Sequence, residues 1–334
     1  MKHEIKTRPI LFFEKTNPPV FVVSAMIMLV FILVATVFTD SSKAFFNFLQ
    51  HSIVKNVSWV FTFCTVLFLA FVLFLLFSRF GSIRLGKDDE RPEFGYTTWF
   101  AMLFSAGMGI GLVFWSIAEP IKHYSSPPIQ GAEAPAPIKQ AMEITFFHWG
   151  LHAWAIFMVV GLSLAFFSYR KGLPLAIRSS FYPLLGNKIY GPWGNFIDIF
   201  AVVGTMFGVA TSLGLGAMQV NSGLNFLGGC PETPLTQIVL IGLITACATT
   251  SVVLGLKKGI SRLSHFNIWL SLILIFFVFL IGPSFYILKT FGESLKNYIS
   301  NIVYFSYWSE WVATEGWQSS WTIFYWGWWI AWAP

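Results

Sequence analysis

Seven apolar stretches of roughly 20 residues each, none of which contains Lys or Arg, run through this sequence. The hydrocarbon core of a bilayer is about 30 Å thick and an α-helix rises about 1.5 Å per residue, so each stretch is long enough to cross it. The stretches are Val20–Thr39, Val57–Phe77, Thr97–Ala118, Ile144–Phe167, Phe196–Met218, Ile238–Leu256 and Ile268–Leu288. The sequence therefore predicts an all-α, multi-pass membrane protein whose surroundings are a lipid bilayer.

Composition excludes the other main classes of protein. The chain of 334 residues is 56% hydrophobic and 11% charged, whereas soluble domains carry about 25% charged residues. A soluble enzyme, a nucleic-acid-binding protein and a disordered chain all need more charge than this. Cys64, Cys230 and Cys247 match neither the spacing of a metal site nor a disulfide framework. The sequence shows no nucleophile–base arrangement that would indicate an enzyme.

The distribution of Lys and Arg predicts the orientation of the chain. Of the 21 such residues, 15 lie in the N-terminal tail and in the loops after the second, fourth and sixth stretches, and six lie in the alternate loops. Loops rich in Lys and Arg stay on the cytoplasmic side of a membrane. We therefore expect a cytoplasmic N-terminus, and a first stretch that is a retained span rather than a cleaved signal peptide.

The C-terminal part of the chain departs from a simple series of spans. Residues 291–305 place apolar side chains on one helical face and polar ones largely opposite, which is typical of a helix lying in the membrane interface. An eighth apolar stretch, residues 321–334, is rich in Trp but too short to cross. Because a charged chain terminus at mid-membrane depth is costly, we expect this sequence to be the N-terminal part of a longer transporter.

Alternating glycines interrupt the third stretch, where the sequence reads Gly107, Met108, Gly109, Ile110, Gly111. Each glycine weakens a helix by roughly 1 kcal/mol relative to alanine. Discontinuous helices at mid-membrane depth hold ions and substrates in transporters, because their unwound backbone exposes carbonyl and amide groups. The alternative is close helix packing through Gly107 and Gly111, and composition does not separate the two interpretations.

Aromatic residues gather on the fourth stretch and on the last one. On a helix, Trp149, Trp154 and Phe157 lie within an arc of about 140°. The last stretch adds a denser set: Trp326, Trp328, Trp329 and Trp332. A quaternary ammonium group has no N–H to donate, but a desolvated cation–π contact with a ring face contributes up to about 2 kcal/mol. Lipid contact or core packing is the alternative for any single ring.

Few ionisable groups lie inside the apolar stretches. Glu119 stands at the outer end of the third stretch and Asp198 at the cytoplasmic start of the fifth. His148 and His152 lie one turn apart on the fourth, and they either relay protons or are hydrogen-bonded structural residues. On the fifth stretch, Thr205 either bonds to neighbouring backbone or contributes to an ion site.

Several of these segments together carry a family resemblance. They are Gly107–Trp115 followed by Glu119-Pro120, then Trp149–Trp154, Ala210–Ala217 and Trp321–Trp329. In these segments the chain resembles the betaine/carnitine/choline transporter family. The dense tryptophan run is the most specific of them, and the resemblance extends over nearly the whole chain from the first span onward.

The resemblance implies a truncated inverted-repeat fold of the leucine-transporter type. The family has about twelve spans, of which the third to seventh and the eighth to twelfth form two inverted repeats. The parts of this chain would then be a cytoplasmic N-terminal tail (1–19), two leading transmembrane helices with a cytoplasmic loop (20–96), the complete first five-helix repeat (97–288), an interfacial amphipathic helix with an outer loop (289–320), and the truncated start of the eighth transmembrane helix (321–334).

The resemblance also implies a substrate site. Carried over by position, Trp149, Trp154, Phe157 and Trp329 form a central aromatic box with Met108 nearby. The other tryptophans of the last stretch, Trp326, Trp328 and Trp332, line the same site or its route, and the unwound helix contains Gly107, Gly109 and Gly111. Phe157 stands where the resemblance predicts a tyrosine, which removes a hydroxyl but keeps the ring face.

The coupling ion is less determined by the resemblance. Sodium-coupled relatives use two hydroxyls one turn apart on the fifth span; Thr205 matches the first, but the second position is Val209, which cannot ligate a cation. A further sodium site would combine carbonyls near Ser105 and Met108 with residues of a helix outside this chain. Coupling to Na⁺, coupling to H⁺ and substrate exchange all stay open, and we expect no other cofactor.

Two functions from different classes follow. The first is secondary active transport of choline or glycine betaine, a symport for osmoprotection, by alternating access around a cation–π box. The resemblance places such a transporter in the bacterial inner membrane as a homotrimer. The second is a transport-inactive remnant or an assembly-only fragment of such a transporter. The sequence does not separate choline from betaine or carnitine.

Overall fold

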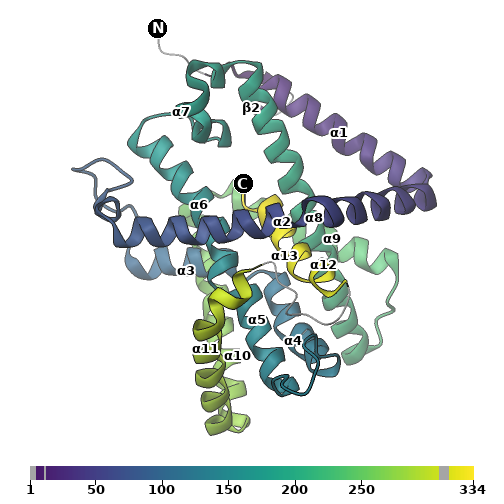
Figure 1. Cartoon of the computed structure of the whole chain (residues 1–334). Helices are drawn as coiled ribbons and strands as arrows, with labels where there is room; N and C mark the ends of the chain where they lie inside the picture. Colours follow the sequence, from purple (N-terminus) through teal and green to yellow (C-terminus); the bar gives the residue numbers. More distant parts are fainter. Residues whose placement is uncertain (1–4, 11–12, 308–315) are drawn as a thin grey trace. The chain divides into compact units, whose positions relative to one another are not determined.

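The computed structural model describes residues 5–10, 13–307 and 316–334, and these are helical along most of their length (Figure 1). In the N-terminal tail, strands β1 (Arg8–Ile10) and β2 (Phe13–Thr16) pair antiparallel. The chain divides into two compact units. The first contains residues 1–90, 150–208 and 306–334, and the second contains residues 91–149 and 209–305.

Among the described residues, six helices are long and apolar enough to cross a membrane, and the bent pair α3–α4 makes a seventh if it is counted as one span. The six are α1 (Pro18–Val37), α2 (Thr39–Phe77), Pro137–Arg170 with α5 and α6, α8 (Pro192–Gly228), α9 (Pro234–Val253), and Leu256–Ile281 with α10. Each predicted apolar stretch corresponds to one of these helices or to the bent pair. The prediction of an all-α membrane protein is therefore confirmed.

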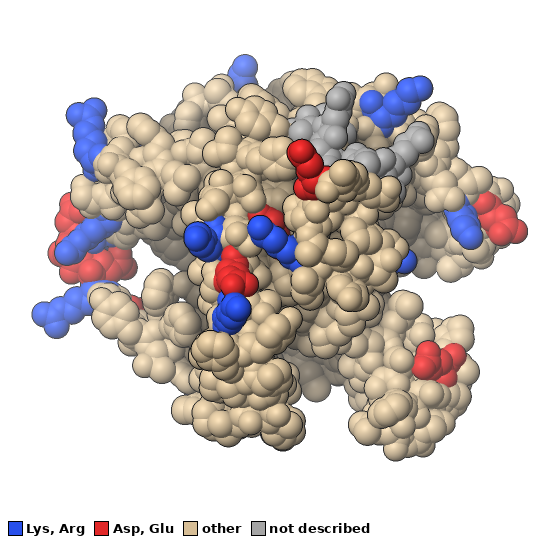
Figure 2. All heavy atoms as spheres, turned by 60° about the horizontal axis from the view of Figure 1, so that its bottom comes forward, with Lys and Arg blue, Asp and Glu red and all other residues tan. Residues whose placement is uncertain are grey.

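Large apolar side chains on these helices face outward. The exposed fractions of Leu29, Phe77 and Phe226 are 66%, 83% and 90%. Broad parts of the face in Figure 2 carry no charged side chain. Such a surface is unfavourable in water and suits the hydrocarbon of a bilayer.

The first unit is built around α2, which packs against α6 (Leu151–Ala165) and α13 (Thr322–Trp332). A single residue, Phe38, separates α1 from α2. The helix α2 begins at Thr39, well before the predicted stretch at Val57, because residues 39–77 contain no Gly or Pro that would stop it. The short helix η1 (Arg79–Ser82) follows α2, and the short helix α12 (Trp317–Ser320) precedes α13.

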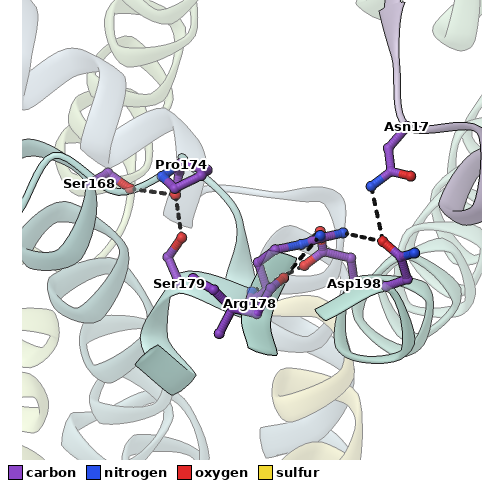
Figure 3. Close-up of polar contacts among 8 residues, drawn as sticks. Asn17, Ser168, Pro174, Arg178, Ser179 and Asp198 are labelled. Carbon is purple, nitrogen blue, oxygen red and sulfur yellow. Dashed lines mark hydrogen bonds and ion pairs between the residues drawn. The ribbon is translucent and has the colours of Figure 1, made fainter. Parts of the chain in front are cut away.

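Buried Arg178 holds together the connection between α6 and α8. The connection consists of η2 (Phe166–Arg170), η3 (Ile177–Phe181), α7 (Tyr182–Leu185) and η4 (Gly186–Tyr190). Arg178 donates from Nε to Oδ2 of Asp198 at 2.6 Å and from Nη2 to Oδ1 of Asn195 at 3.1 Å (Figure 3). A third bond runs from Nη1 to the carbonyl of Ile189 at 3.2 Å. Because Asn195 also accepts from Nδ2 of Asn17 at 3.1 Å, the network ties the start of α1 to the start of α8.

In the second unit, α3 (Tyr96–Gly107) packs against α10 (Ser261–Ile281), and α4 (Ile110–Ser125) packs against α5 (Pro137–Trp149). The amide of Asn267 on α10 donates to Oγ of Ser105 on α3 at 2.8 Å. Between α9 and α10 the chain forms η5 (Leu256–Ile260). This arrangement holds both halves of the interrupted third stretch in one compact unit.

The helix predicted over residues 291–305 is part of α11 (Ser284–Ser306). It begins earlier than predicted because Gly282 and Pro283 end α10 at Ile281, so residues 284–288 do not belong to the preceding span. Tyr298 and Phe305 on its apolar face are buried and contact rings of α5, with Phe305 5.4 Å from Phe147. Residues 308–315 of the expected outer loop lie outside the described part of the chain.

Candidate functional site

Stacked aromatic rings cover one face of α13. Tyr325, Trp328 and Trp329 recur at helical spacing, and all three are buried. The rings of Trp328 and Trp329 are 5.1 Å apart with 7° between their planes, and those of Tyr325 and Trp329 are 5.8 Å apart at 11°. Stacked pairs of this kind contribute about 0.5–1.5 kcal/mol each beyond the area they bury. The helix therefore presents nearly parallel ring faces inside the first unit.

Two rings of α6 continue the ring contacts that begin on α13. Phe157 contacts Trp329 at 6.0 Å and Trp332 at 5.7 Å, in both cases edge to face. Trp154 lies 5.8 Å from Phe157 and is 41% exposed. We call Trp154, Phe157, Trp329 and Trp332 the aromatic cluster. These predicted substrate-binding residues form one contiguous set of ring contacts.

Two glycines of α8 allow α13 to approach closely. A Cβ atom at Gly208 would lie only 2.9 Å from Cβ of Trp332. A Cβ atom at Gly204, one turn earlier, would lie 3.5 Å from the carbonyl oxygen of Ala331, which is an ordinary contact. In addition, Nε1 of Trp328 donates to the carbonyl of Gly208 at 3.3 Å. The position of α13 therefore depends on the missing side chain at Gly208.

Trp326 lies against His152 of α6. It is 1% exposed, and its ring lies 6.0 Å from that of His152 on α6, with 26° between the planes. His152 in turn hydrogen-bonds through Nε2 to Oγ of Ser306 at 2.8 Å. Of the two interpretations of His152, this geometry favours the hydrogen-bonded structural residue.

The third apolar stretch is interrupted at its glycines. The helix α3 ends at Gly107, Met108 is its C-cap, and α4 begins at Ile110 after Gly109 in extended conformation. The two segments are bent by 53° relative to each other. Backbone groups on either side of such a break lack the partners that a continuous helix supplies. Their use in binding a substrate or an ion stays a prediction, as does the role of Gly111.

The other predicted site residues are divided between the two units. Thr205 is half-buried on α8 in the first unit, whereas Ser105, Met108 and Trp149 belong to the second. The hydroxyl of Ser105 accepts the hydrogen bond from Asn267. The joint roles of these residues with the aromatic cluster, in substrate binding and in ion coupling, stay predictions.

A buried polar cluster joins α4 to α5 in the second unit. Oε1 of Glu119 accepts from Nδ1 of His148 at 2.5 Å and from Nε2 of His123 at 3.2 Å. Oε2 of the same carboxylate accepts from Nε1 of Trp149 at 2.7 Å. The side chains of Glu119, His123 and His148 are at most 1% exposed. A carboxylate this deeply buried is tolerated because several donors satisfy it.

Three members of this cluster, Glu119, His123 and His148, could also hold a metal ion. Their ligand atoms all lie within 4.8 Å of one another, and within the described residues this is the group of His, Cys, Asp and Glu side chains that meets this condition. His123 was missed in the sequence, although its i, i+4 spacing from Glu119 was visible there. The pairing of Glu119 with His148 and Trp149, about 30 residues away, depends on the packing of α5 against α4.

Comparisons with known proteins identify relatives of this chain. Residues 19–334 match the model of the betaine/carnitine/choline family of transporters. A probable glycine betaine transporter of Desulfitobacterium hafniense is 44% identical over 96% of this chain and 64% of its own length. The glycine betaine transporter OpuD of Bacillus subtilis is 49% identical over 85% of this chain and 56% of its own. The osmo-dependent choline transporter BetT2 of Acinetobacter baylyi is 39% identical over 96% of this chain and 47% of its own length. The chain thus spans about half to two thirds of the length of these relatives.

Proposed function

Because the chain belongs to the betaine/carnitine/choline family of transporters, we propose that the whole protein carries a quaternary ammonium compound, glycine betaine or choline, across a membrane. The relatives are named as transporters of these two compounds. The observation in this chain that supports the proposal most directly is the aromatic cluster of Trp154, Phe157, Trp329 and Trp332.

The chemistry of the rings suits a methylated cation. A trimethylammonium group is bulky, weakly hydrated and unable to donate a hydrogen bond, so it is held by ring faces rather than by acceptors. Each desolvated cation–π contact contributes up to about 2 kcal/mol, and three such contacts would correspond to several decades of affinity. Because the rings contact one another, substrate entry requires side chains of the cluster to separate. Phe157 keeps the ring face that a tyrosine would offer.

Further elements of the proposal rest on the sequence resemblance. Met108 and Trp149 would complete the substrate site, and the interrupted helix at Gly107, Gly109 and Gly111 would line it. Alternating access would expose this site to each side of the membrane in turn. Thr205 would take part in coupling to Na⁺, with H⁺ coupling and exchange as the alternatives. From the resemblance we further propose a homotrimer in the bacterial inner membrane. The N-terminus would be cytoplasmic, because Lys and Arg are concentrated in the N-terminal tail and in the loops predicted to lie on its side of the membrane.

Uptake of labelled glycine betaine and choline by the full-length protein, expressed in cells that lack other uptake systems, tests the proposal. Trp329→Leu should abolish uptake, because leucine fills space but has no ring face. The matched control is Trp193→Leu, since Trp193 lies at the start of α8 and is 61% exposed; it should transport normally. A wild-type protein that neither binds nor moves any quaternary ammonium compound, or an active Trp329→Leu variant with unchanged KM, would contradict the proposal.

A further inference from the structure

We propose that Glu119 is a positioning residue for Trp149: its carboxylate holds the indole in one orientation, so that the ring presents its face to the quaternary ammonium group. The inference rests on the proposed function, in which Trp149 is a substrate-binding residue. It assigns a role in substrate affinity to a buried acid that does not itself touch the substrate.

Trp149 lies where its ring needs an external support. It is the last residue of α5, and Gly150 separates it from the start of α6. Its side chain is only half-buried, so packing alone leaves the ring more freedom than a core tryptophan has. The bond from its Nε1 to Oε2 of Glu119 at 2.7 Å has the length of a charge-assisted hydrogen bond. This bond fixes the one polar point on the ring and therefore the direction in which the face points.

The carboxylate of Glu119 is in turn held in place. Its other oxygen accepts from His148 at 2.5 Å and from His123 at 3.2 Å. His123 is one turn further along α4, and His148 is the neighbour of Trp149 on α5. With Oε1 committed to the two imidazoles, Oε2 is directed at the indole. The arrangement resembles the outer shell of a binding site, in which buried groups orient the residue that makes the contact.

Ring orientation matters because an indole attracts a cation only at its face. The edge of an aromatic ring is electropositive and the face is electronegative, so a rotated ring would repel the substrate where it should attract it. A carboxylate that accepts from the indole N–H also pushes electron density onto the ring, which makes the ring face more electronegative and its attraction for a cation stronger. Both effects act on substrate affinity, whereas a role limited to folding would change the amount of active transporter.

The experiment compares Glu119→Ala, Glu119→Gln and Trp149→Phe in the full-length protein. Uptake of labelled glycine betaine gives KM and the maximal rate. The protein is also labelled with 5-fluorotryptophan, and the fluorine resonance of residue 149 is identified by its loss in Trp149→Phe. The matched control is Glu143→Ala, because Glu143 is an equally buried carboxylate on α5, 3% exposed and hydrogen-bonded by Asn301.

We expect Glu119→Ala to shift and broaden the resonance of Trp149 and to raise KM about tenfold or more, with the maximal rate within about twofold per folded molecule. Glutamine keeps an acceptor but removes the charge, so Glu119→Gln should raise KM about three- to fivefold. Trp149→Phe keeps a ring without the N–H and should also raise KM. Glu143→Ala should leave both the resonance and KM unchanged.

The two proposals fail in distinguishable ways. An unchanged Trp149 resonance in both Glu119 variants would overturn the positioning role, whatever the uptake data. The same conclusion follows if the maximal rate falls with the folded amount while KM stays constant. A resonance that moves while the wild-type protein transports no quaternary ammonium compound would support the positioning of the ring and overturn the proposed function. If Glu119→Ala does not fold, Glu119→Gln and Trp149→Phe still decide the question.

Discussion

Replacing Gly208 by alanine tests whether the contact between α8 and α13 sets the geometry of the aromatic cluster. The added Cβ would lie 2.9 Å from Cβ and 3.1 Å from Cα of Trp332, and 3.3 Å from its backbone nitrogen. These neighbours are backbone and the root of a side chain, so a rotamer change cannot relieve the contact. Overpacking of this kind costs about 1–3 kcal/mol, and α13 must move away from α8.

Gly204 supplies the matched control one turn away. Its added Cβ would meet the carbonyl of Ala331 at 3.5 Å, which is an ordinary contact. Both substitutions gain the same helix propensity, about 1 kcal/mol, so this term cancels in the comparison. We therefore expect Gly208→Ala to be less stable than Gly204→Ala by about 1–3 kcal/mol.

Two measurements check this expectation on the purified full-length protein. Thermal unfolding in detergent, followed by tryptophan fluorescence, should give a lower Tm for Gly208→Ala than for Gly204→Ala. Uptake of glycine betaine should show a raised KM for Gly208→Ala, because displacement of Trp332 and Trp329 disturbs the ring contacts with Phe157. Equal stability and equal KM in the two variants would refute the argument that α13 depends on the missing side chain at Gly208.

Two further predictions concern the connections in the first unit. Arg178→Met should destabilise the protein by about 3–5 kcal/mol, because it leaves Asp198 and Asn195 without the guanidinium that satisfies them; thermal unfolding in detergent measures this, and a wild-type Tm would contradict it. Arg170 hydrogen-bonds Asp88 at 2.6 Å and thereby lowers the pKa of that carboxyl. A lowered pKa contributes stability above the ordinary value of about 4 and loses it as the pH falls through the folded-state pKa. The stability difference between wild type and Asp88→Asn should therefore be present at pH 7 and shrink on acidification, and a difference independent of pH would contradict the pairing.

Local pattern was enough to predict most of the helices and the family. A bilayer imposes the length and polarity of each span, so Val20–Thr39 and Ile238–Leu256 read directly as α1 and α9. The sequence likewise placed Trp329 and Trp332 in one dense set of tryptophans on the last stretch, but only the structure shows that both rings contact Phe157. Boundaries were less accurate where no stop signal separates two segments, as in α2, which runs uninterrupted from Thr39 to Phe77.

The sequence by itself thus determined the fold class, the approximate positions of the spans and the residue types available for a methylated cation, because these follow from length, hydropathy and side-chain chemistry along the chain. Only the tertiary structure decided which of these residues meet. The packing of α4 on α5 brings Glu119 to Trp149, and the absence of a side chain at Gly208 brings α8 against Trp332. Such pairings join residues far apart in sequence, and their energy depends on distances that no local pattern encodes.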